Sequence, residues 1–196
     1  MPGPDTTFQA YGLSWANASN TPFRLFKKFA HEGGISTPLI VSWPAEIKNP
    51  GIITSQPGHV MDIMATCLDV ASISYPAEFN GNKITPLEGK SLMPILRGNQ
   101  RDGHEYICWE HRGNRAIRKG KWKLVSYYNG AAETVEAKGG VWELYDIEND
   151  RSELVNLSGK FPTIVQELTE LYDTWASKNG VVAWSELPLN RTKTHY

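Results

Sequence analysis

The stretch Asn114-Arg-Ala-Ile-Arg-Lys-Gly-Lys-Trp-Lys-Leu-Val-Ser-Tyr-Tyr128 decides the fold that we predict for this chain. Its centre, residues 118–121, predicts a tight hairpin turn, because Gly120 can adopt the positive φ angle that such turns require. After the turn the side chains alternate between two faces, with Trp122, Leu124 and Ser126 opposite Lys123 and Val125. This period of two residues is typical of a β-strand.

Two further segments extend the hairpin into a sheet. The four predicted strands cover residues 105–110, 114–118, 121–128 and 141–147. Residues 162–177 predict a helix whose apolar residues recur every three or four positions: Ile164, Val165, Leu168, Leu171, Tyr172 and Trp175. The aromatic residues expected between sheet and helix are Trp122, Trp142, Tyr145 and Trp175. We therefore predict an α+β fold in which a four-stranded antiparallel sheet packs on a long C-terminal helix.

The first half of the chain is predicted to be a remnant of a larger α/β domain. Residues 21–28 suggest a short helix that Gly33 and Gly34 end, and the continuous apolar run at residues 38–43 predicts a buried strand. Residues 58–73 predict a helix, with an apolar stripe formed by Val60, Ile63, Met64, Cys67, Leu68 and Ala71. One strand and one helix cannot form a sheet, so we expect most of that sheet to lie outside this sequence.

These patterns divide the sequence into three parts. Residues 1–100 are predicted to be the C-terminal remnant of a larger α/β domain, residues 101–184 the α+β subdomain, and residues 185–196 a polar tail.

The composition bears on partners. The chain has 20 basic and 21 acidic residues among 196, a net charge of -1, so no global field favours nucleic acid or an anionic membrane. No apolar run approaches the roughly 20 residues of a membrane span. The two cysteines, Cys67 and Cys108, are too few for a disulfide framework or a cysteine metal cluster. We therefore expect neither a nucleic-acid nor a membrane partner.

A lysine lies shortly before two consecutive glycines. Lys27 precedes Gly33 and Gly34, where the backbone can approach a ligand closely. A cation in this position is suited to hold an anionic oxygen. The neighbouring Lys28 offers the same charge, and we expect it to face water. On these residues alone, an anion site and an ordinary surface lysine both remain open.

Five segments, taken in order, resemble the C-terminal portion of type I sulfatases, the arylsulfatase-like and formylglycine-dependent enzymes of the alkaline-phosphatase-like superfamily. The first is Lys27 followed by His31-Glu-Gly-Gly-Ile-Ser-Thr-Pro-Leu-Ile40 and Trp43-Pro44. The other four cover residues 60–71, 89–98, 115–124 and 144–157. Each motif is weak by itself, but five in the family's order form a specific pattern.

The resemblance implies a hydrolase of aryl or carbohydrate sulfate esters. Family members use a formylglycine nucleophile and a Ca²⁺ ion, and Lys27 matches a lysine that binds the sulfate group. A region that can approach the mouth of the pocket in sulfatases corresponds to Glu110, His111, Asn114 and Arg115, which become candidate substrate-binding residues. His31 is a further candidate, either for the site or for local hydrogen bonding.

The sequence also departs from a complete sulfatase. It contains no Cys/Ser-x-Pro-x-Arg motif from which formylglycine is made, since Cys108-Trp-Glu-His-Arg112 has Glu110 where the motif has proline. It contains no Asp-Asp or Asp-Asn pair of the calcium-ligand type, so we expect no metal site in this chain. The nucleophile and metal ligands are expected in a missing N-terminal catalytic region, upstream of Met1. This chain alone is therefore expected to be inactive.

Two other functions stay open. One is a non-catalytic α+β module that binds a partner chain through the apolar flank at residues 39–43. The other is a phosphoester hydrolase of the same superfamily.

Overall fold

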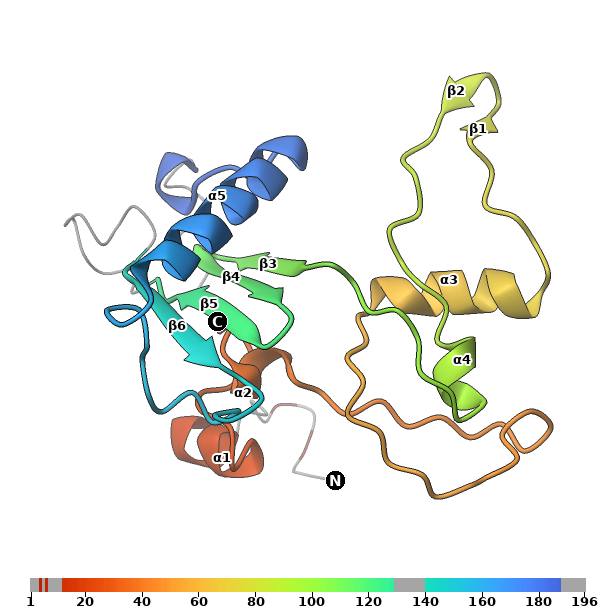
Figure 1. Ribbon diagram of the computed structural model, residues 1–196, viewed down its shortest axis with the longest axis horizontal. Helices are drawn as coiled ribbons and strands as arrows, with labels where there is room; N and C mark the ends of the chain where they lie inside the picture. The colour runs from red at the N-terminus through yellow and green to blue at the C-terminus, as the bar shows by residue number, and fades with distance from the viewer. Residues whose placement is uncertain (1–3, 5, 7–11, 129–139, 188–196) are drawn as a thin grey trace. The chain divides into compact units, whose positions relative to one another are not determined.

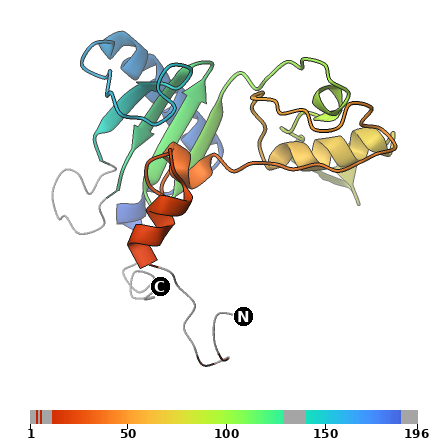
Figure 2. The ribbon, with the colours of Figure 1, turned by 90° about the horizontal axis from the view of Figure 1, so that it is seen from below.

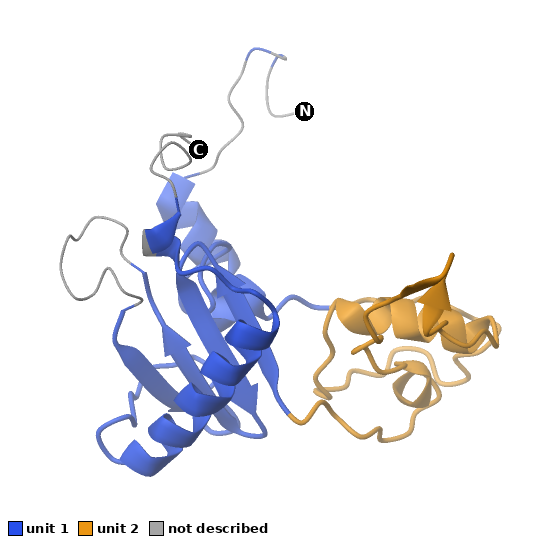
Figure 3. Ribbon diagram, turned by 90° about the horizontal axis from the view of Figure 1, so that it is seen from above, with its two compact units in different colours: residues 1–38, 106–196 blue, residues 39–105 orange. Residues whose placement is uncertain are grey.

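The computed structural model describes residues 4, 6, 12–128 and 140–187. The chain forms two compact units, which Figure 3 shows in two colours. The sheet unit contains residues 1–38 and 106–196, and the helix–loop unit contains residues 39–105.

The sheet unit is built on four antiparallel strands in sequence order (Figure 1). These strands are β3 (Ile107–His111), β4 (Asn114–Lys119), β5 (Trp122–Ser126) and β6 (Trp142–Asp146). Gly120 has a φ of +56° in the turn between β4 and β5, as its position predicted. The 17-residue helix α5 (Pro162–Lys178) follows. The predicted α+β fold is therefore confirmed.

Both faces of the sheet are covered. On one face Leu124 packs with Ile117 and Leu144 against Leu168 and Tyr172 of α5. The other face carries a second cluster, which includes a residue of the N-terminal segment: Ala30, Ala116, Val125, Tyr145 and Ile147. Figures 1 and 2 show α5 and the N-terminal segment on opposite sides of the strands.

The predicted aromatic core is confirmed for three of its four members. Trp122, Trp142 and Trp175 pack in the cluster beneath α5. Tyr145 is buried on the opposite face of the sheet, so its predicted place between sheet and helix is wrong. The alternation of residues along β6 puts Leu144 and Tyr145 on opposite faces.

The N-terminal segment differs from the prediction. Its described helices are α1 (Gly12–Ser19) and the single turn α2 (Glu32–Ile35). The predicted helix over residues 21–28 is wrong, because Leu25 and Lys28 have φ angles of +64° and +97°, in the left-handed region that an α-helix excludes. Gly33 and Gly34 lie inside α2 rather than in a turn that ends a helix.

The two units divide the chain elsewhere than at the predicted boundary. Residues 1–38 belong with the sheet and not with residues 39–100, because the Ala30 region packs on the sheet face opposite α5. Residues 188–196 of the predicted polar tail lie outside the described residues.

The helix–loop unit contains two helices and a short hairpin. These are α3 (Met61–Val70), α4 (Met93–Leu96), β1 (Glu78–Phe79) and β2 (Asn82–Lys83). The predicted buried strand at residues 38–43 is wrong for this chain: it has no regular structure, and the Ile40 side chain is 91% exposed. Within the described residues no strand pairs with it, so its backbone lacks the partners that a strand requires.

The predicted helix in this unit is confirmed, although the side that it buries is not the predicted one. Val60, Ile63 and Met64 of the apolar stripe are exposed, whereas Asp62 and Ala65 of α3 are buried. No helix among the described residues is both long and apolar enough to cross a membrane.

Asp62 joins three segments of the helix–loop unit. Its carboxylate accepts hydrogen bonds from Arg101 Nη2 at 2.8 Å, from His104 Nε2 at 2.7 Å, and from the backbone N–H groups of His59 and Lys90 at 2.9 Å each. Burial alone would raise the pKa of Asp62, but these donors outweigh it and lower the pKa to about 2.

We expect Asp62→Asn to destabilise this unit by about 3 to 5 kcal/mol, because it leaves the guanidinium of Arg101 buried without its counter-charge. The Asp62 contribution is fully present above the ordinary aspartate pKa of about 4, and it is lost as the pH falls towards about 2. Hydrogen exchange of the α3 amides between pH 2 and pH 6 measures both effects.

Asp69→Asn is the matched control, since Asp69 is an exposed carboxylate on the same helix. Equal protection of α3 in both variants would contradict the assignment of Asp62 as the organising charge.

Candidate functional site

The loop that carries Lys27 lies directly on the backbone of α2. The Gly33 N–H donates to the carbonyl of Arg24 at 3.0 Å. A Cβ atom on Gly33 would lie 2.1 Å from that same carbonyl oxygen, and one on Gly34 would lie 2.0 Å from the carbonyl oxygen of Phe29. Only glycine lets the backbone of α2 come this close to the backbone of residues 24–29, so the Gly33–Gly34 pair allows the Lys27 loop to pack on α2.

Lys27 and Lys28 differ in their surroundings. Both side chains are exposed. Lys28 Nζ lies 5.7 Å from the ring centroid of Phe29. Within the part of the chain that the structure describes, no side chain or backbone group bonds to the ammonium of Lys27. The Lys27 ammonium can therefore accept an external anion without breaking an internal contact.

A buried ionic cluster lies under the loop, formed by Glu32, Lys123 and Glu153. Lys123 Nζ is 2.9 Å from Glu32 Oε1 and 2.8 Å from Glu153 Oε1. The other carboxylate oxygen of Glu153 accepts a hydrogen bond from the backbone N–H of Glu32 at 2.8 Å. Lys123 and Glu153 are 0% exposed, so these charges are shielded from water. The cluster connects α2 to β5 and to the loop after β6.

Arg151 completes the charge balance of this cluster. Its guanidinium lies 3.4 Å from Glu32 Oε2 and donates to the hydroxyl of Ser36 at 2.8 Å. Burial alone would raise the pKa of Glu32, but the charges of Lys123 and Arg151 outweigh it and lower that pKa. Glu32 is therefore ionised at neutral pH and acts as a structural anion.

His31 is a buried hydrogen-bonding residue. Its Nε2 lies 3.2 Å from Glu143 Oε2, and the same oxygen accepts a hydrogen bond from the Tyr145 hydroxyl at 2.6 Å. The hydrogen bond with His31 is the main reason that the pKa of Glu143 is lowered. Burial and the adjacent Glu143 raise the pKa of Tyr145. His31 is only 1% exposed and makes this local hydrogen bond, and its predicted contact with substrate stays a prediction.

The other four candidate residues lie at the ends of β3 and β4, on either side of the turn that joins these strands. Glu110 Oε1 accepts from the backbone N–H of Gly113 at 2.9 Å, and Asn114 Nδ2 donates to the carbonyl of His111 at 3.0 Å. The Arg115 guanidinium lies 4.4 Å from the ring centroid of Trp142. Glu110 and Asn114 thus stabilise the hairpin turn, Arg115 packs on a ring of β6, and His111 is exposed. Their predicted contact with substrate stays a prediction.

Sequence reasoning missed the charged residues that support the loop. Lys123 shares a strand face with Val125, and a charged residue on a buried face signals a buried partner. The sequence therefore indicates that Lys123 has a buried partner. It does not identify the partners, because Glu32 lies 91 residues before Lys123 and Glu153 lies 30 residues after it.

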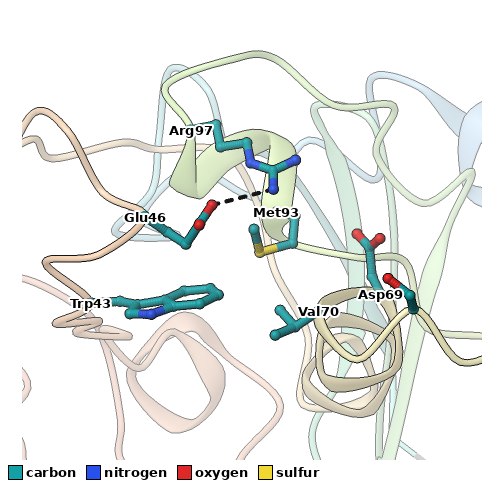
Figure 4. A pocket seen from close by; sticks show the side chains of 7 residues that line it. Trp43, Glu46, Asp69, Val70, Met93 and Arg97 are labelled. Carbon is teal, nitrogen blue, oxygen red and sulfur yellow. Dashed lines mark hydrogen bonds and ion pairs between the residues drawn. The ribbon is translucent and has the colours of Figure 1, made fainter.

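The helix–loop unit has a surface hollow of about 310 Å³, drawn in Figure 4. It is lined by Trp43, Glu46, Asp69, Val70, Ser72, Met93 and Arg97. Arg97 Nη2 and Glu46 Oε2 form an ion pair of 3.3 Å at its edge.

The described residues do not fit a calcium site. Among them, no group of three or more His, Cys, Asp or Glu side chains is placed to hold a metal ion.

Comparison with known proteins shows the family. Residues 22–175 match the family model of the C-terminal domain of N-sulphoglucosamine sulphohydrolase. An uncharacterized sulfatase of Schizosaccharomyces pombe is 36% identical over 183 residues, which cover 92% of this chain and 32% of that protein. An N-acetylglucosamine-6-O-sulfatase of Bacteroides thetaiotaomicron is 31% identical over 139 residues, which cover 68% of this chain and 23% of that protein.

A solved structure from the glycosaminoglycan metabolism of Bacteroides thetaiotaomicron is 25% identical, with a TM-score of 0.45. The match covers 59% of this chain and 24% of that one. The chain spans about a third of the length of the first two curated relatives that it matches.

The chain belongs to the sulfatase family and corresponds to its C-terminal domain. The predicted family membership is therefore confirmed.

Proposed function

We propose that this chain forms the C-terminal part of an enzyme that hydrolyses sulfate esters, and that Lys27 binds the sulfate group. The observation that carries the proposal is the exposed ammonium of Lys27, which is unpaired within the described residues and lies on a loop supported by buried charges. Lys28 is the weaker candidate because its ammonium already lies over the Phe29 ring.

The chemistry of the reaction gives Lys27 its proposed role. A sulfate ester carries a negative charge on its non-bridging oxygens, and charge develops on the leaving oxygen as the ester bond breaks. A positioned ammonium stabilises such charge most strongly where it grows in the transition state. The formylglycine and Ca²⁺ of family members would supply the nucleophile and further charge neutralisation from outside this chain. Lys27 would contribute sulfate binding and orientation.

Two features guide the choice of substrate. One relative carries the name N-acetylglucosamine-6-O-sulfatase, which favours a sulfated carbohydrate over a simple aryl sulfate. The near-neutral charge of the chain, -1 overall, gives no reason to prefer a polyanionic substrate.

The test is an assay of the complete protein that contains this chain, with 4-nitrophenyl sulfate, N-acetylglucosamine 6-sulfate and 4-nitrophenyl phosphate as substrates. We expect release of sulfate from at least one sulfate ester and little release of phosphate. Preferred hydrolysis of the phosphate ester would instead support the phosphoester hydrolase. The isolated 196-residue chain is expected to give no turnover above a Lys27→Ala control.

A second candidate function is a non-catalytic module that binds a partner chain. It is favoured by the exposed apolar side chains of the helix–loop unit, of which Ile40 and Ile53 are 91% and 97% exposed. In a complete sulfatase we propose that the N-terminal catalytic region covers these side chains. Sedimentation of the isolated chain as a clean monomer without self-association would count against a partner-binding module.

A further inference from the structure

The loop that carries Lys27 is anchored to the sheet on both sides of the lysine. Before the lysine, Arg24 Nη1 donates to the Tyr145 hydroxyl at 3.1 Å and also to the backbone carbonyl of Glu153. After the lysine, Glu32 forms an ion pair with Lys123 and donates its backbone N–H to Glu153. Glu153 therefore receives both ends of the loop, one at its backbone and one at its side chain.

Three residues in and next to these anchored segments have backbone conformations that are unfavourable for residues other than glycine. Leu25 and Lys28, on either side of Lys27, have positive φ angles, and buried Glu153 has a φ of +55°. Such conformations are sparsely populated by residues other than glycine, and they persist only where the surrounding structure fixes them. The anchors at Arg24, Glu32 and Glu153 supply that constraint.

Buried ion pairs contribute little net stability, because removing their charges from water costs free energy. Apolar residues of similar volume often stabilise a protein as well as a buried ion pair does. A buried ionic cluster does, however, constrain direction and distance, because moving any member would separate buried charges from their partners. The Glu32–Lys123–Glu153 cluster thus suits a place where position matters more than stability.

We propose that Lys123 and Glu153 are positioning residues for sulfate binding. They hold the Lys27 loop so that the lysine ammonium meets the sulfate group at a fixed place. The inference rests on the proposed function, because it assigns the cluster to the same sulfate site. It also gives the α+β subdomain a role in catalysis, since both positioning residues belong to it.

The test is a double-mutant cycle in the complete protein, with the kcat and KM of the best sulfate ester as readouts. The charge-balanced variant Lys123→Met/Glu153→Gln removes one cation and one anion, and it leaves Glu32 beside Arg151. We expect its kcat to fall by at least about tenfold in the presence of Lys27, because small displacements of a positioned group are costly. In the Lys27→Ala background the same change should lower kcat by less than about twofold.

The milder variant Glu153→Gln retains a side-chain oxygen that can accept the hydrogen bond from the Glu32 N–H. It replaces the double variant in this test if the double variant does not fold. Leu168→Ala is the matched control, since it creates a cavity beneath α5 on the opposite face of the sheet. It should lower the unfolding temperature without changing the kcat per folded molecule.

A readout that needs no catalysis separates this inference from the proposed function. Amide hydrogen exchange in residues 25–31 should accelerate in the cluster variants and not in Leu168→Ala. Absence of sulfatase activity in the wild-type protein would overturn the proposed function and leave the exchange result to decide whether the cluster fixes the loop. Equal loss of kcat with and without Lys27, or unchanged exchange in the loop, would overturn the positioning role.

Discussion

Replacing Lys27 by alanine in the complete sulfatase is expected to lower the turnover of a sulfate ester by about 100- to 1,000-fold. This corresponds to about 3 to 4 kcal/mol, the typical loss when a positioned donor to a developing anion is removed. The side chain is exposed and unpaired among the described residues, so its removal should leave the fold intact. Steady-state kinetics give the effect, and circular dichroism shows whether the fold is retained.

Lys28→Ala is the control for this prediction. The two lysines are adjacent and exposed, and they carry the same charge, but the Lys28 ammonium lies 5.7 Å from the centroid of the Phe29 ring. We expect Lys28→Ala to change kcat by less than about threefold, since loss of a screened surface charge has little effect on a site that it does not touch. A larger loss of kcat in Lys28→Ala than in Lys27→Ala would assign sulfate binding to Lys28 instead.

The second large effect is expected at Gly33. In Gly33→Ala the new Cβ would lie 2.1 Å from the carbonyl oxygen of Arg24 and 2.3 Å from that of Leu25. Both are backbone atoms of the Lys27 loop, so the loop must move away from α2. We expect a loss of about 1 to 3 kcal/mol of unfolding free energy or more, the usual range for overpacking a fixed site. Chemical denaturation of the complete protein measures this loss.

Gly159→Ala is the matched control, because no heavy atom lies within 4 Å of the Cβ that it would add. It should change the unfolding free energy by no more than about 0.5 kcal/mol. Equal stability of Gly33→Ala and Gly159→Ala would show that the loop does not rest on α2 as described.

The sheet and the C-terminal helix could be predicted because their information is local. Alternation along residues 122–126, a glycine in the adjoining turn and a helical stripe in residues 162–177 each specify an element without knowledge of its partners. All three appear where they were predicted, with boundaries shifted by one or two residues.

Residues 21–43 could not be predicted in the same way, because their conformation depends on distant groups. The loop at residues 24–31 is fixed by Tyr145 and Glu153, and nothing in its own sequence announces the positive φ angles of Leu25 and Lys28. The apolar run at residues 38–43 has the composition of a strand, but the described part of this chain offers it no neighbouring strand. A strand pattern predicts pairing only where a partner is present.

The candidate site was predicted in part. The motif around Lys27 indicated an anion site and matched the family. The Glu32–Lys123–Glu153 cluster was not predicted, because its members are far apart in sequence. His31 and the hairpin residues Glu110, Asn114 and Arg115 have hydrogen bonds or ring contacts within the sheet unit. Polar residues at strand ends often satisfy their own turns, and sequence alone does not separate these from ligand-binding residues.

The central claim is that Lys27 binds the sulfate group, and inhibition by inorganic sulfate tests it most directly. In the complete enzyme, a charged hydrogen bond to sulfate is expected to contribute roughly 1.5 to 3 kcal/mol. The inhibition constant of sulfate should therefore rise about 10- to 100-fold in Lys27→Ala and stay within about twofold of the wild type in Lys28→Ala. An unchanged inhibition constant in Lys27→Ala would contradict the account.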